Sequence, residues 1–242
     1  MTYFSVDGTE DNFYTAVFDA YKIKECIITS EPSVQLRLGA EIVDVVTDPD
    51  KCERVRKKLR ALDNGCLDDV HLLLKSNAPL KENVAFDYIK LIIANGGPVR
   101  GMLADPTVIE MTDIRRRVTD EAHKMKGFLR FMENENGVLY APYTPDNDIT
   151  DMLAVHFSAR FSSKQFVIHD LRRKICAMYD GNEIIMTSAG DAEIYLSEYE
   201  AYFQNLWREY YESVNIASRP HEKQMRGYMP VRYWKFLPEK RK

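Results

Sequence analysis

The sequence contains no apolar run that is long enough to cross a membrane. Its longest candidate, Tyr88–Ala94, is interrupted by Lys90, whereas a transmembrane helix needs about 18 or more consecutive apolar residues. The first twenty residues hold four carboxylates and neither Lys nor Arg, so they lack the basic start of a signal peptide. These absences predict a cytoplasmic protein that does not bind a membrane.

Clustered cysteines are also missing. The four cysteines, Cys26, Cys52, Cys66 and Cys176, stand far apart, and none of them forms a Cys-x-x-Cys pair or has a histidine at metal-ligand spacing. Zinc ribbons, iron–sulfur clusters and disulfide frameworks all need such spacings. We therefore expect buried, reduced thiols and no bound metal.

Glycine motifs that bind phosphates or dinucleotides do not occur. Gly96, Gly97 and Gly101 follow a predicted helix rather than a strand, and Met102 and Leu103 stand where a phosphate-binding loop carries Lys and Ser or Thr. The Gly-x-Ser-x-Gly motif of α/β-hydrolases is absent as well. We expect a helix end and a turn at these glycines, and no cofactor.

Positive charge is not in excess over the chain. Thirty-three Lys and Arg residues face 37 Asp and Glu residues, which gives a formal charge of −4 and argues against a protein that coats nucleic acid nonspecifically. Any basic surface must therefore be local. Apolar residues make up 45% of the 242 residues, so the chain can bury a sizeable core without cross-links.

Residues 1–103 are predicted to be mainly helical, with two short strands. Tyr3–Val6 and the Ile- and Val-rich segment Ala40–Thr47 have strand composition, and we expect them to pair. Thr9 and the Asp48-Pro49 pair are typical helix starts. Apolar residues at helical spacing predict further helices over residues 67–74 and 82–94.

Residues 104–242 are predicted to form an antiparallel sheet with helices packed on it. Asp105 and Pro106 open a long helix that Gly127 ends, and the apolar period then becomes strand-like. We expect a hairpin over Phe128–Tyr143, strands at Gln165–His169, Ile175–Tyr179 and Ile184–Thr187, a helix capped by Asp148 and a final helix from about Ser197 to Val214. The predicted fold class is α+β, divided between residues 103 and 104 or built as one continuous fold.

Three histidines in the second half are candidates for acid–base chemistry. His123, His156 and His169 carry imidazoles that titrate near neutral pH, and Asp170 directly follows His169. Neighbours in a strand point to opposite faces, which disfavours a direct pair between His169 and Asp170. Hydrogen-bonded structural histidines are the alternative interpretation.

Basic residues give the stronger pattern. Mid-chain cations at Lys124, Lys126, Arg130, Arg172 and Arg173 are followed by a tail, residues 219–242, in which eight cations and two carboxylates give a net charge of +6. Within that tail, Arg226, Arg232 and Lys235 alternate with Tyr233, Trp234 and other aromatic residues. Cations beside flat rings suit a phosphate backbone with unpaired bases. Equally, the rings could anchor the tail while its charges stay in water.

Four segments resemble a family of bacterial DNA-metabolism proteins: Glu121–Phe131, the His156-Phe157 and Arg160-Phe161 pairs, Phe166–Asp170 with Arg172, Arg173 and Tyr179–Gly181, and the ending Gln224-Met225 with Met229–Lys235. Tyr3–Tyr21 and Thr47–Pro49 are similar too, whereas Glu25–Ala40 matches weakly and is expected to be a variable loop. The resemblance implies a DNA-repair context, a radical-SAM partner related to spore photoproduct lyase, and a domain also found fused to a uracil-DNA glycosylase-like domain. It implies no catalytic residues.

Three hypotheses follow. The leading one is an accessory DNA-repair protein that binds damaged or single-stranded DNA together with a radical-SAM partner, because this chain lacks the cysteine cluster of that chemistry. The second is an enzyme that acts on a base or phosphodiester through a histidine. The third is a protein interaction module. Convergence of two histidines in a polar cleft would favour the enzyme, and convergence of arginines with the tail would favour DNA binding.

Overall fold

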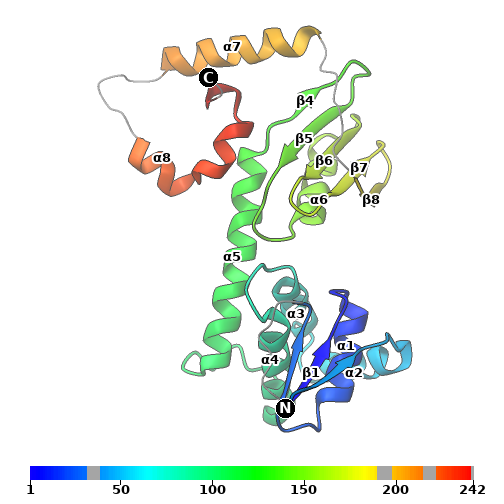
Figure 1. Cartoon of the computed structure of the whole chain (residues 1–242). Coiled ribbons are helices and arrows are strands. Elements are labelled where there is room, and N and C mark those ends of the chain that lie inside the picture. Colours follow the sequence, from blue (N-terminus) through cyan, green and yellow to red (C-terminus); the bar gives the residue numbers. More distant parts are fainter. Residues whose placement is uncertain (32–38, 190–197, 215–221, 241–242) are drawn as a thin grey trace. The chain divides into compact units, whose positions relative to one another are not determined.

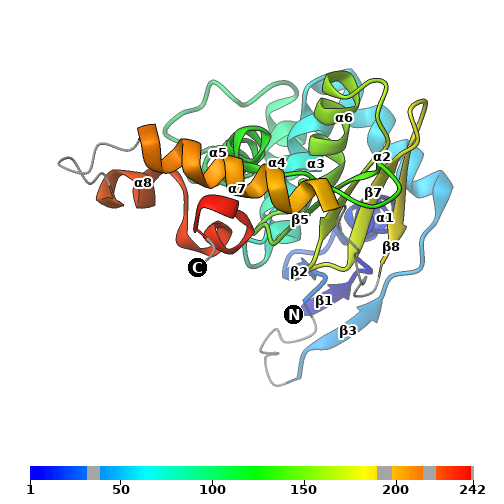
Figure 2. The same ribbon diagram turned by 90° about the horizontal axis from the view of Figure 1, so that it is seen from above.

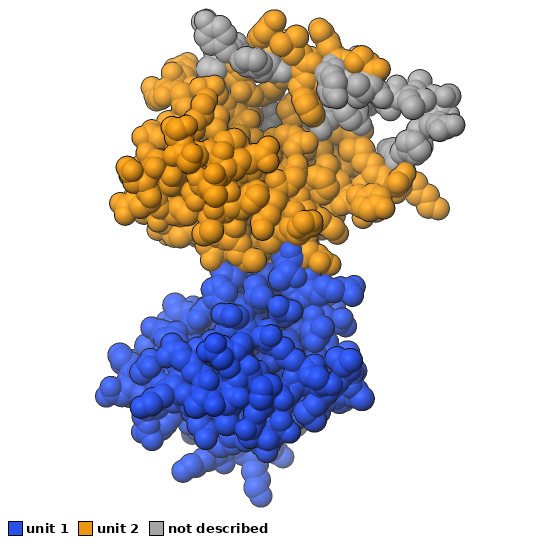
Figure 3. Space-filling view, turned by 180° about the vertical axis from the view of Figure 1, so that it is seen from behind, with its two compact units in different colours: residues 1–119 blue, residues 120–242 orange. Residues whose placement is uncertain are grey.

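The computed structural model describes residues 1–31, 39–189, 198–214 and 222–240. Ser197, where the last long helix was expected to start, and Arg219 at the start of the basic tail lie outside the described residues. Contacts within the chain divide it into two compact units, Met1–Thr119 (unit 1) and Asp120–Lys242 (unit 2), which Figure 3 colours separately. The predicted domain boundary between residues 103 and 104 stays a prediction.

Unit 1 contains a three-stranded parallel sheet. The strands are β1 (Thr2–Ser5), β2 (Cys26–Thr29) and β3 (Glu41–Asp44), in the order β2-β1-β3. Pairing of the first strand with the Ile- and Val-rich segment is confirmed, with Phe4 opposite Val43. The segment Glu25–Ala40, expected to be a loop, supplies β2, while residues 32–38 lie outside the described part of the chain.

Unit 1 also contains four helices, and the first two begin after the predicted capping residues Thr9 and Asp48. They are α1 (Glu10–Ala20), α2 (Pro49–Leu62), α3 (Cys66–Leu74) and α4 (Lys81–Asn95) (Figure 1). The Asp48 side chain accepts hydrogen bonds from the Asp50 and Lys51 amides, at 2.9 and 3.1 Å, which satisfies unpaired donors of the first turn of α2. Gly96 ends α4 with a φ of 71°.

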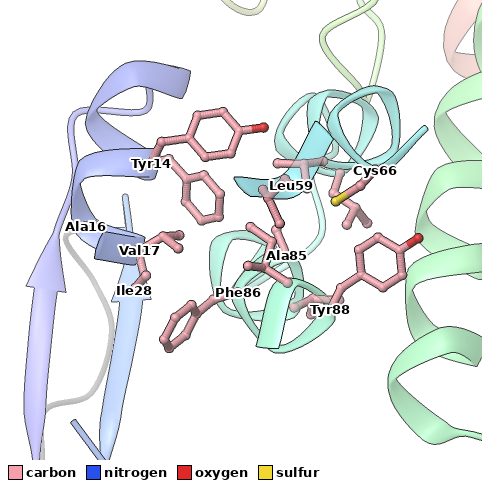
Figure 4. Close-up of a cluster of buried hydrophobic side chains, with 14 of the residues drawn as sticks. Tyr14, Ala16, Val17, Ile28, Leu59, Cys66, Ala85, Phe86 and Tyr88 are labelled. Carbon is pink, nitrogen blue, oxygen red and sulfur yellow. The ribbon is translucent and has the colours of Figure 1, made fainter. Parts of the chain in front are cut away.

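The core of unit 1 lies between this sheet and its helices. Figure 4 shows side chains from α1, β2, α2, α3 and α4 that point toward one another. Val17, Leu59, Phe86 and Ile28 are at most 2% exposed. Burial of apolar side chains contributes roughly 1.5 to 3 kcal/mol each, so this cluster holds the unit together.

A long helix, α5 (Pro106–Phe128), crosses the boundary between the units, and unit 2 then forms a five-stranded sheet. Its order is β4-β5-β6-β7-β8, from β4 (Met132–Glu133), β5 (Leu139–Tyr143), β6 (Phe166–Asp170), β7 (Ile175–Tyr179) and β8 (Ile184–Ser188). The predicted strands of β6, β7 and β8 are confirmed, and β7 and β8 pair as an antiparallel hairpin.

The prediction of a purely antiparallel sheet is wrong, because β5 and β6 run parallel. The reason is α6 (Thr150–Arg160), which connects the two strands and packs on β6 and β7, since a helical crossover returns the chain in the same direction. The predicted hairpin is also shorter than expected, because Phe128 still belongs to α5 and only Met132 and Glu133 pair with β5.

The start of α6 corrects a further prediction. Its N-cap residue is Ile149, with no side-chain hydrogen bond, so Asp148 is not the cap. Asn147 is instead held by Glu121, and this fixes the chain just before the helix.

The described part of the C-terminal segment consists of one long helix followed by short helical elements. After α7 (Glu198–Val214) come α8 (Glu222–Tyr228) and two 3-10 turns, η1 (Val231–Phe236) and η2 (Pro238–Lys240). Figures 1 and 2 show α7 alongside the C-terminal turns, and η2 contacts α7. In the described ranges, no helix combines the length and the apolar character needed to cross a bilayer.

Candidate nucleic-acid interface

The buried carboxylate of Glu121 on α5 accepts hydrogen bonds from two separate segments of unit 2. The backbone amides of Asp146 and Asn147 donate to it at 2.9 and 2.8 Å, and the Asn147 side-chain amide donates at 2.7 Å. Tyr233 and Arg232 of η1 donate to the same carboxylate, the guanidinium at 3.2 Å. Glu121 thereby ties the loop before α6 to the C-terminal segment.

Asp146 lies between two arginines at the surface of this cluster. Its carboxylate is 2.5 Å from Nη2 of Arg232 and 3.5 Å from Nη1 of Arg172. The Arg172 side chain is 54% exposed and that of Arg232 is 42% exposed. Solvent therefore reaches both guanidinium groups, and Asp146 is an internal counterion for both.

Asp170, at the end of β6, positions Arg172 and the next residue, Arg173. It is fully buried, and its carboxylate accepts the backbone amides of Arg172 and Arg173 at 2.9 and 3.1 Å. The Arg173 guanidinium bonds Asp170 at 2.8 Å and reaches the backbone oxygens of Pro145 and Asp146. Arg173 is thus a structural clamp, and Arg172 is the member of the pair that faces solvent.

The cluster is balanced in charge. Three guanidinium groups, from Arg172, Arg173 and Arg232, face the three carboxylates of Glu121, Asp146 and Asp170, so three minus three leaves no formal charge. Burial raises the pKa of Glu121, but hydrogen bonds from Tyr233, Asp146 and Asn147 outweigh it and bring the pKa below its ordinary value. Glu121 is therefore ionised at neutral pH.

The three candidate histidines lie in different surroundings. His169 is 1% exposed, and its Nδ1 lies 2.7 Å from the hydroxyl of Tyr140, whose pKa burial raises to about 12. His156 packs edge-on against Phe157, and partial burial with the nearby charges of Lys126 and Arg160 lowers its pKa. His123 is exposed on α5. A buried ring and an exposed ring do not share one polar cleft.

A groove of about 520 Å³ lies where α5 ends, beside α7 and η2. Arg130 and Trp207 line it, with the guanidinium 5.8 Å from the centre of the Trp207 ring, together with Phe131, Gln204 and Pro238. Trp207 is 40% exposed. Sequence reasoning named Arg130 as a site residue but did not single out Trp207.

Tyr233 ties the tail to α5 through its hydrogen bond to Glu121. Tyr233 is 4% exposed, and the Trp234 indole N–H donates to the backbone oxygen of Met229 at 3.1 Å. Arg226 and Lys240 lie 5.9 and 5.1 Å from the centre of the Trp234 ring, and Lys235 lies 4.8 Å from that of Phe236. These contacts of Trp234 lie within the tail, so they order the tail itself.

The remaining predicted cations do not share one surface. Lys124 and Lys126 stand two residues apart on α5, and residues at that spacing point to different sides of a helix. Arg115 of α5 lies 3.1 Å from the fully buried Asp69 in unit 1, which Arg100 also binds at 2.6 Å. No group of His, Cys, Asp and Glu residues that could hold a metal occurs in the described parts of the chain.

A model of a domain of unknown function, DUF4130, matches residues 79–239. The chain belongs to this family. No curated protein and no solved structure matches the chain. The DUF4130 match spans every residue of the cluster around Glu121 and Asp146, and its description assigns no activity to them.

Two members of the cluster, Asp146 and Asn147, were missed by sequence reasoning. Glu121 begins one of the segments that carry the family resemblance, but it was not singled out as a site residue. A Glu next to the apolar stripe of a helix, two residues from His123 and one turn before Met125, is the available signal for a buried carboxylate.

Proposed function

We propose that this DUF4130 protein binds single-stranded or damaged DNA through Arg172 and Arg232 of unit 2. The observation that supports the proposal is the convergence of the arginine turn after β6 with the C-terminal segment on one acidic residue, Asp146. Convergence of this kind was the feature expected to favour DNA binding over the enzyme hypothesis. The separate surroundings of the three histidines give the enzyme hypothesis no support.

Asp146 marks the position of an incoming phosphate. Guanidinium groups bind carboxylates and phosphates through the same planar set of N–H donors. Ion pairs between partly exposed groups contribute only about 0 to 1 kcal/mol, so a phosphate can replace Asp146 at small cost. The Arg232 guanidinium is held by the buried Glu121, which limits the side-chain entropy that it loses on binding, and Asp170 fixes the backbone at Arg172.

The groove beside Trp207 supplies a place for an unpaired base. Stacking of a base on an aromatic side chain contributes roughly 1 to 3 kcal/mol and tolerates any sequence. The C-terminal segment connects the two features, because η1 carries Arg232 and Pro238, the first residue of η2, lines the groove. A strand that exposes its bases can use both features, whereas an intact duplex can use only the arginines.

The biological setting of this proposal rests on the family resemblance. It suggests a cytoplasmic DNA-repair role beside a radical-SAM partner, which would supply the chemistry while this chain holds the strand. Co-expression with that partner tests this part, and the expected result is a complex that survives purification and binds lesion-bearing oligonucleotides more tightly than either protein alone. Two proteins that never associate would remove the partner from the proposal.

Two substitutions test the DNA site, one that should weaken DNA binding and one that should tighten it. Arg172→Ala should weaken binding of a fluorescent oligothymidylate about threefold to tenfold. It should also reduce the slope of log K against log salt concentration by about 0.7. Asp146→Asn keeps the shape of the side chain but removes the internal counterion, so it should tighten binding about threefold or more. Lys164→Ala is the control, because Lys164 is an exposed cation of unit 2 that lies 3.9 Å from Glu133, outside the cluster.

Fluorescence anisotropy at several salt concentrations measures these effects. Asp146→Asn with unchanged or weaker affinity, or Arg172→Ala that behaves like the Lys164→Ala control, would contradict the site. Trp207→Ala should reduce the preference for single strands over duplex, whereas Trp234→Ala should mainly lower the melting temperature, because Trp234 is bonded to Met229.

A further inference from the structure

Unit 1 contains a pocket that the proposed DNA site does not use. It has a volume of about 550 Å³ and lies where the last turn of α1 meets α2 and the end of α4. Pockets of roughly 300 to 1,000 Å³ are typical of small-molecule sites. All but one of its lining residues precede residue 79, where the DUF4130 match begins. The pocket is therefore independent of the cluster in unit 2.

The floor of the pocket is apolar. Val17 of α1 and Leu59 of α2 belong to the core and are 2% and 0% exposed, and Figure 4 shows both within the packed cluster. Val55 and Ile93, which are partly buried, complete the floor. These side chains offer no hydrogen bonds, so the floor suits a hydrocarbon or aromatic body rather than a sugar or a nucleobase edge.

The rim of the pocket is cationic. Lys22, Arg54 and Lys58 line it and are exposed, and the Arg54 guanidinium lies over the Phe18 ring at 4.8 Å, which fixes its place at the rim. The only lining carboxylate, Asp19, is already paired with Lys51 at 2.7 Å. Three cations therefore face the pocket with no unpaired acidic side chain among its lining residues.

We propose that this pocket binds a small organic anion with an apolar body, such as an aromatic or medium-chain carboxylate, sulfonate or phosphate monoester. The apolar part lies on Val17, Val55 and Leu59, and the anionic group lies at the rim among Lys22, Arg54 and Lys58. A cationic ligand is repelled by this rim, and a strongly polar ligand leaves its hydrogen-bonding groups unsatisfied against the floor. Charge complementarity thus selects the chemical class of the ligand.

Two fluorescent probes with the same ring system test the proposal on the full-length chain. Anilinonaphthalene sulfonate carries an anionic group, whereas N-phenylnaphthylamine has the same rings without it. The sulfonate should bind at one saturable site, with an affinity at least about fivefold higher than that of the neutral probe. Octanoate should displace it, and octylammonium should not.

Three variants locate the site. Arg54→Gln combined with Lys58→Gln should weaken sulfonate binding roughly fivefold and leave the neutral probe unchanged. Lys57→Gln is the matched control, because Lys57 is an exposed neighbour on α2 that does not line the pocket. Val55→Trp should abolish binding of both probes by filling the floor. Melting curves identify any variant that is unfolded, and the double Gln variant, which changes only exposed side chains, keeps the test valid if Val55→Trp fails to fold.

Equal affinity for the two probes would overturn the proposal, because the cations at the rim would then not favour the anionic probe over the neutral one. Sulfonate binding that the double Gln variant does not weaken would also overturn it. Displacement of the probe by an acidic amphipathic peptide at lower concentration than octanoate would reassign the pocket to protein docking. Each of these results leaves the proposed DNA site of unit 2 unaffected, because that site is tested separately, by oligonucleotide binding to wild type and the Arg172→Ala variant.

Discussion

Glu121 connects three segments that lie far apart in the sequence, and its substitution should show how much unit 2 depends on it. Glu121→Gln replaces one carboxylate oxygen by an amide that must face donors from Tyr233 and Arg232 or from Asn147. Glu121 is only 8% exposed, so the mismatch should cost roughly 2 to 4 kcal/mol of unfolding free energy. Urea denaturation at neutral pH measures it, with Glu135→Gln in the exposed hairpin turn as control.

The same substitution predicts a pH dependence. The folded-state pKa of Glu121 lies below its ordinary value of 4.5, because hydrogen bonds to the charged form outweigh the effect of burial. A carboxyl with a lowered pKa stabilises the fold fully above its unfolded pKa, and this contribution is lost as the pH falls through the folded pKa. The stability difference between wild type and Glu121→Gln should therefore be constant near pH 7 and shrink below about pH 4.5. A difference that grows with acid would contradict the role given to Glu121.

At the residue scale, sequence reasoning succeeded where local geometry decides. Alternation along a strand disfavoured a direct pair between His169 and Asp170, and the structure gives the two side chains different partners, since His169 contacts Tyr140 and Asp170 binds Arg173. It could not find Asp146, whose partners Arg172 and Arg232 come from distant parts of the chain. Such a site is a product of the tertiary fold, and residue type alone does not reveal it.

At the scale of elements, the end of α4 offers a clean test of backbone conformation. Gly96 has a φ of 71° and Gly97 does not have a positive φ, while a Cβ atom added at either glycine meets nothing within 4 Å. Gly96→Ala should therefore cost roughly 1 kcal/mol, from left-handed strain alone, and Gly97→Ala should be nearly neutral. Thermal denaturation of the two variants compares them directly. Equal costs would contradict the role given to the φ angle at this helix end.

Element types were easier to predict than their pairing. Caps such as Asp48 and turns such as Asp180 act within a few residues, and Asp180 does accept the amides of Asn182 and Glu183 at 2.8 and 2.9 Å. Whether β5 pairs parallel or antiparallel with β6 depends on the crossover through α6. The predicted element order already contained that helix between the two strands, so the parallel pairing was available from connectivity but not from periodicity.

At the scale of the whole molecule, each unit has a core of its own, and this predicts two separable unfolding events. Leu59 in unit 1 and Phe166 in unit 2 are both 0% exposed, so truncation of either to Ala should cost about 3 kcal/mol in its own unit. Both tryptophans of the chain, Trp207 and Trp234, lie in unit 2, so their fluorescence reports on that unit, whereas far-ultraviolet circular dichroism reports on both. The two signals can therefore distinguish the units within one intact protein.

Leu59→Ala should move a transition seen by circular dichroism down by roughly 10 °C and leave the tryptophan transition in place, while Phe166→Ala should move the tryptophan transition by a similar amount. The reason is that each side chain packs within a core of its own unit, and units with separate cores unfold separately unless the segment that joins them couples them. Here that segment is α5, a continuous helix from Pro106 to Phe128. A single transition in which both substitutions shift the tryptophan signal equally would show that α5 makes the two units one cooperative body.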